Sequence, residues 1–77
     1  MKKKRLTNPF RRPRLAARLR EIRIQSGITQ TALAIRLNGA APAIANFESG
    51  QAIPSPNWIR RLALALGVDP EELEALR

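Results

Sequence analysis

The chain contains the stretch TQTALAIRLNGAAPAIANFESG, Thr29–Gly50, in which two short apolar patterns are separated by Asn38-Gly39. In the first pattern, Leu33, Ala34 and Leu37 recur at the three- and four-residue spacing of one helix face. Asparagine and glycine both tolerate the left-handed backbone conformation that ends a helix and turns the chain sharply. The stretch therefore predicts two helices joined by a tight turn.

The second of these helices is expected at about Ala41–Ser49, with Pro42 in its first turn and with Ile44 and Phe47 facing inward. The rest of this helix is rich in alanine. Apart from Asn46, the side chains before residue 48 have almost no capacity to form hydrogen bonds. The outer face of this helix is therefore expected to be nearly bare.

Three further helices flank this pair. A helix is expected from Pro13 to about residue 25, because apolar residues follow at the i, i+4 and i+7 spacing until Ser26-Gly27 ends the pattern. Another follows the cap at Ser55-Pro56 and ends at Gly67, and a short one follows Asp69-Pro70, which joins a capping Asp to a first-turn Pro. No stretch has the pattern of a strand. The sequence predicts a compact all-α domain of five short helices.

Composition narrows the functional classes. A chain of 77 residues forms one small domain, and it contains no cysteine and no histidine. Disulfides, thiolate metal sites and the usual general base are therefore excluded, and the carboxylates are explained as helix caps. We expect neither an enzyme nor a cofactor. No apolar run of membrane-spanning length and no signal peptide is visible, so a cytoplasmic location is expected.

The positive charge is concentrated at the N-terminus. Residues 1–23 hold ten basic side chains against one glutamate, whereas residues 24–77 carry a net charge of −1. Dense like charge and two prolines in residues 1–14 predict that residues 1–12 form a disordered basic arm. Such an arm on a nearly neutral body indicates a polyanionic partner, most often nucleic acid. A solubilising tail and an anionic membrane surface are the alternatives, and the membrane is disfavoured because the first five residues have no apolar face.

Several motifs at matching distances resemble the phage-repressor family of helix-turn-helix proteins, also described as the Cro/cI or xenobiotic-response-element type. The resemblance covers roughly Leu15–Leu73. The matching pieces are Ile28-Thr29-Gln30, Leu33-Ala34 with Ile44 ten residues after Ala34, Glu48-Ser49-Gly50 followed by Pro54, and the segment LALALGVDPEEL. The resemblance implies a lambda-repressor-like DNA-binding domain over residues 13–77, with the helix-turn-helix motif at residues 29–48.

The same resemblance implies roles for individual residues. The third helix lies in the major groove and the second crosses the DNA backbone. Gln30 holds a phosphate, and Arg23 forms a structural salt bridge with Glu48. The positions expected to contact bases are Ala40, Ala41, Pro42 and Asn46.

Where the sequence departs from the family pattern, the third helix is expected to recognise bases less specifically. Ala40 replaces the usual Ser or Thr cap of the third helix. Direct recognition of bases uses side chains such as Arg, Asn or Gln. Among the positions expected to contact bases, Asn46 alone is of this kind, and it is expected to bond to adenine. The alanines and Pro42 offer contacts to thymine methyl groups. Affinity must therefore come largely from phosphate contacts, for which the candidates besides Gln30 are Lys2, Lys3, Lys4, Arg5, Arg11 and Arg12.

Two functions remain open at this point. The first is a DNA-binding transcriptional regulator, by analogy with the family a repressor, that binds a pseudo-palindrome as a homodimer with half-sites about one DNA turn apart. The alternative is a protein-interaction module or an antitoxin with reduced base recognition, whose partner is a toxin or another regulator. The basic arm and Gln30 favour the first function, and the bare third helix favours the second. Trp58 is expected at the edge of the core, and Arg60 and Arg61 in solvent.

Overall fold

The computed structural model describes residues 12–39 and 41–77, and this part of the chain folds into helices without a strand. The predicted all-α fold is confirmed. The helices are α1 (Pro13–Gln25), α2 (Gln30–Arg36), α3 (Ala41–Ser49), α4 (Pro56–Leu66) and α5 (Pro70–Glu74).

Local chemistry accounts for where these helices begin and end. Thr29 caps α2 by accepting a hydrogen bond from the backbone N–H of residue 32, and Ser55 and Asp69 cap α4 and α5 in the same way. The turn between α2 and α3 contains Asn38 and Gly39 with φ angles of 66° and 83°. These left-handed conformations reverse the chain within a few residues, as the Asn-Gly pair predicted.

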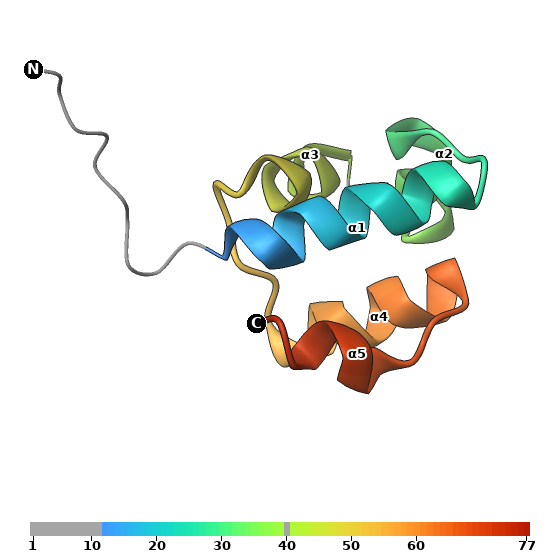
Figure 1. Cartoon of the computed structure of the whole chain (residues 1–77). Coiled ribbons are helices and arrows are strands. Elements are labelled where there is room, and N and C mark those ends of the chain that lie inside the picture. The colour runs from blue at the N-terminus through green and yellow to red at the C-terminus, as the bar shows by residue number, and fades with distance from the viewer. Residues whose placement is uncertain (1–11, 40) are drawn as a thin grey trace, which may run out of the picture.

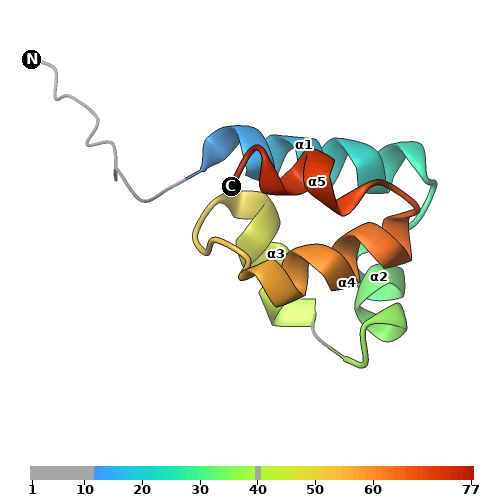
Figure 2. The ribbon, with the colours of Figure 1, turned by 90° about the horizontal axis from the view of Figure 1, so that it is seen from below.

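In the view of Figure 1, α1 runs between α3 and the α4–α5 pair, and the view of Figure 2 shows that α1 lies along one edge of the molecule. α1 packs against α3 and α5, α2 packs against α3, and α4 packs against α5. The view from below shows α5 lying along α1 (Figure 2). The core between these layers is formed by Leu15, Leu19, Ile22, Leu33, Ala34, Leu37, Ile44, Phe47, Ile59, Leu62, Ala63, Leu66 and Leu73.

The C-terminal residue returns to the start of α1 (Figures 1 and 2). Arg12 Nε donates a hydrogen bond to the carbonyl oxygen of Arg77 over 2.6 Å, and Arg77 Nε donates to the carbonyl oxygen of Pro54 over 2.9 Å. Arg12, a predicted phosphate contact, is thus engaged with the end of the chain.

A second tie joins α1 to α5 at the surface. Arg18 contacts Glu21 within α1 over 2.9 Å and Glu72 of α5 over 2.7 Å. The hydrogen bond to Glu21 and then that to Glu72 raise the pKa of the Arg18 guanidinium, which is charged at neutral pH in any case. These side chains are about one-third exposed or more, so solvent screens the pairs and they add little stability.

Candidate nucleic-acid interface

The outer face of α3 is open to solvent. Ala41, Pro42 and Asn46 are exposed, and Ala45 between them is half-buried. A helix rotates by about 100° per residue, so these four positions fall on one arc, opposite the inward-facing Ile44. No other segment among residues 12–39 and 41–77 covers this arc. The face is therefore free to approach a partner.

Asn46 is the hydrogen-bonding group that this face presents. Its side-chain amide has no partner among the described residues, whereas its backbone carbonyl accepts from the N–H groups of Gln51 and Ala52. The nearby hydroxyl of Ser49 is turned to the same carbonyl, to which it donates over 3.2 Å. Beside the amide the arc offers methyl and ring carbons, so its capacity for direct base recognition is narrow.

Several predicted contact residues lie outside the described residues, namely Ala40, Lys2, Lys3, Lys4, Arg5 and Arg11. Their expected contacts to bases and phosphates remain predictions. The same holds for the expected disorder of the arm, of which the structure describes Arg12 alone.

A buried polar network lies beneath the C-terminal end of α3. Arg23 Nε and Nη2 donate to the two carboxylate oxygens of Glu48 over 2.7 and 3.0 Å, and Nη1 donates to the carbonyl oxygen of Ile28 over 2.7 Å. The side chains of Arg23 and Glu48 are 10% and 4% exposed. The pair is thus bidentate and nearly dry, the geometry in which a charge pair fixes two helices relative to each other.

Gln30 belongs to the same network. Its Nε2 donates to Oε1 of Glu48 over 3.1 Å, which ties the first residue of α2 to α3. The resemblance to the phage-repressor family implies separate roles for Gln30, as a phosphate contact, and for the Arg23–Glu48 salt bridge. No signal in the sequence joined them, because Gln30 and Glu48 are 18 residues apart and meet through tertiary packing. One amide N–H of Gln30 remains available for a phosphate oxygen.

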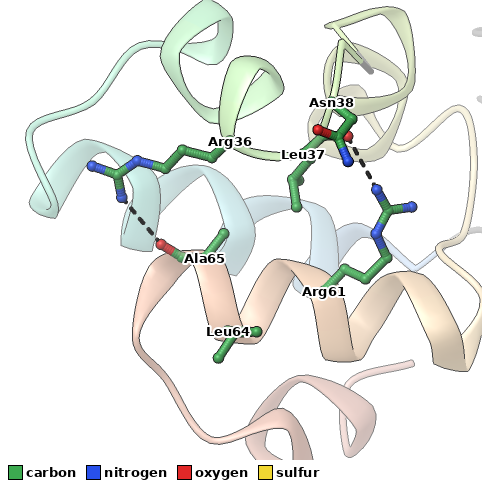
Figure 3. A pocket seen from close by; sticks show the side chains of 6 residues that line it. All are labelled: Arg36, Leu37, Asn38, Arg61, Leu64 and Ala65. Atoms are coloured by element: carbon green, nitrogen blue, oxygen red, sulfur yellow. Dashed lines mark hydrogen bonds between the residues drawn. The ribbon is translucent and has the colours of Figure 1, made fainter.

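A shallow pocket lies between the end of α2 and α4 (Figure 3). Two arginines of the pocket join these helices. Arg36 of α2 donates to the carbonyl oxygen of Ala65 in α4 over 3.3 Å, and Arg61 of α4 donates to the carbonyl oxygen of Leu37 at the end of α2 over 3.0 Å. The pocket is lined by Arg36, Leu37, Asn38, Arg61, Leu64 and Ala65.

The expectation that Arg61 is solvated was wrong. Its guanidinium lies 4.4 Å from the ring centroid of Trp58, which in turn meets Phe47 edge-to-face with centroids 5.2 Å apart. The stacking and the bond to Leu37 hold Arg61 against the body. Trp58 lies at the edge of the core as predicted, and Arg60 is exposed as predicted.

The described residues hold no cluster of three or more potential metal ligands. None of their helices has the length and apolar character needed to cross a membrane.

Comparisons with known proteins agree with this geometry. A family model described as a helix-turn-helix domain matches residues 14–76. Among crystal structures, the chain is similar to the restriction-modification controller protein C.AhdI from Aeromonas hydrophila, with 34% sequence identity and a TM-score of 0.74. That match covers 79% of this chain and 88% of the other. A comparison with curated proteins found no match.

Proposed function

The chain belongs to the helix-turn-helix domain family, and from this membership we propose that it is a DNA-binding transcriptional regulator of the Cro/cI repressor type. α3 enters the major groove and α2 crosses the DNA backbone. The observation that carries this proposal is the uncovered outer arc of α3, held at a fixed angle to α2 by the buried Arg23–Glu48–Gln30 network. The similarity to a restriction-modification controller protein supports a regulatory role.

Each part of the surface has its own task in this proposal. Asn46 bonds to a base edge, while Ala40, Ala41 and Pro42 approach thymine methyl groups. Gln30 donates to a phosphate from the start of α2. The basic residues before α1, with Arg12, supply most of the charge that neutralises phosphates.

The regulator acts as a cytoplasmic homodimer on a pseudo-palindromic site, because a single copy with one amide on its base-facing arc selects too few base pairs. Two copies double the number of recognised bases and the number of phosphate contacts. Repression follows when such a site overlaps the start of a gene. No catalytic role is part of the proposal.

A second function is favoured by the bareness of α3. An exposed arc of alanines and proline with a single amide also suits contact with another protein, as in an antitoxin that binds a toxin. This interaction module is the competing proposal. It predicts binding to a protein partner without enrichment of any DNA sequence.

Selection of bound sites from random duplex DNA at two salt concentrations separates these functions. We expect an enriched pseudo-palindromic motif that persists at the higher salt. Retention of all sequences alike, with a steep loss at higher salt, would indicate non-specific binding through the arm. Absence of retention at both concentrations would contradict the DNA-binding proposal and favour the protein partner.

Replacing Asn46 with alanine is expected to remove discrimination at one base pair of the selected site. A good bidentate contact to adenine contributes about 1–3 kcal/mol, so the preference for that base pair should fall by about 5- to 150-fold. Affinities of wild type and Asn46→Ala for the selected site and its single-base variants measure this. Ser49→Ala is the matched control, because the Ser49 hydroxyl already bonds to the backbone. Unchanged discrimination in Asn46→Ala would contradict the base contact.

A further inference from the structure

The outer face of α4 carries an unusually exposed leucine. Leu64 has 86% of its surface open to solvent, more than the other exposed large apolar side chains of the described residues. Arg60 and Arg61 precede it by four and three positions and so lie on the same helix face. Basic side chains therefore lie on the N-terminal side of Leu64.

Acidic side chains lie beyond Leu64 in the opposite direction. The chain reverses at Gly67, which has a φ of 74°, and α5 begins after Asp69. Asp69 and Glu71 are exposed, and they are the acidic residues of the described chain that form no salt bridge. Along the chain from Arg60 to Glu71, the exposed side chains thus change from basic, through an apolar centre, to acidic.

Such an arrangement is complementary to itself when rotated by half a turn about its centre. We propose that two copies of this chain pack α4 against α4 in antiparallel orientation, with a two-fold axis passing beside Leu64. The two leucines meet at the axis, and the Arg60 side chain of each copy faces Glu71 of the other. The proposal rests on the homodimer of the proposed function and assigns its interface.

Helix geometry supports this register. Four residues of helix rise by about 6 Å, so Arg60 lies about that far from the axis, and the start of α5 of the second copy lies on the same side. The long, exposed side chain of Arg60 can span the remaining gap, whereas Arg61 is held by Trp58 and Leu37. Ala65, a half-buried residue of the neighbouring pocket, follows Leu64 and gives the incoming leucine an apolar surface to contact (Figure 3).

The proposed interface buries a small area, so the affinity of one copy for the other is expected to be low. A single pair of short helices buries less than the roughly 1,200–2,000 Å² typical of stable complexes. Self-association should therefore be weak without DNA and become complete on a site that holds both copies close together.

Sedimentation equilibrium of the full chain without DNA, over a series of concentrations, tests the interface. Leu64→Glu is expected to weaken self-association by about tenfold or more, because it places a charge at the axis. Ile24→Glu is the matched control, since Ile24 is a 51% exposed apolar side chain on α1, outside the interface. Circular dichroism establishes that each variant keeps its helices.

Exchanging the charges of Arg60 and Glu71 tests whether the partner bound at the α4 face is a second copy of this chain. Arg60→Glu should weaken self-association by several-fold, and adding Glu71→Arg in the same chain should restore it. A wild type that remains monomeric, a Leu64→Glu variant that associates normally, or a double variant without recovery would each overturn the interface. Normal dimers that retain no DNA in the selection would leave the interface intact and contradict the proposed function.

Discussion

Replacing Glu48 with alanine is expected to lower the free energy of unfolding by about 3 kcal/mol. The Arg23 side chain, which is 10% exposed in the structure, would lose both carboxylate oxygens, and a buried charge without its partner is strongly destabilising. Gln30 would lose its partner in the same step. Denaturant unfolding followed by helical circular dichroism measures the loss.

Glu72→Ala is the matched control, because it removes the exposed carboxylate that pairs with Arg18 between α1 and α5. Those side chains are 34% and 38% exposed, so the expected loss is below about 1 kcal/mol. An unfolding curve of Glu48→Ala that coincides with the wild type would show that the Arg23–Glu48 pair does not hold α3 against α1.

The second large effect concerns salt. If the basic residues engage about six phosphates, the logarithm of the binding constant should fall against the logarithm of salt concentration with a slope of about −5. Raising monovalent salt fourfold should then weaken DNA binding by about a thousandfold. Fluorescence anisotropy of a labelled duplex at several salt concentrations gives the slope directly.

Deleting residues 1–5 is the test of where those contacts arise. The deletion removes four of the basic side chains, so binding at low salt should weaken several-fold and the slope should become shallower. Arg20→Ala removes one exposed basic side chain from α1, outside the predicted phosphate contacts and the proposed dimer interface, and serves as the control. Equal affinity and an equal slope with and without residues 1–5 would contradict the role of the arm.

The helices could be predicted from the sequence because their signals are local. A capping side chain lies two or three residues from the N–H that it accepts from, and Asn38-Gly39 and Gly67 mark turns by their own backbone preferences. The inward faces follow from helical spacing within a dozen residues. These interactions do not depend on the rest of the fold, so the order, ends and buried faces of the helices were determined by the sequence alone.

The contacts of the functional surface were harder to predict from the sequence than the helices were. The Arg23–Glu48 pair was expected from the resemblance to a family, and the spacing of its members carries no signal of its own. Gln30 as the third member, and Arg61 stacked on Trp58, were not anticipated. Each arises where side chains from separate helices meet.

The sequence by itself determined the helices, their turns and the segregation of charge toward the N-terminus, because these depend on neighbours along the chain. The tertiary structure decided which polar groups share the dry space beneath α3, and it decided that Arg61 lies against Trp58 and Leu37 instead of in solvent. The physical reason is that burial and distance between segments depend on how the helices pack, and packing brings together residues that are 18 or 25 positions apart.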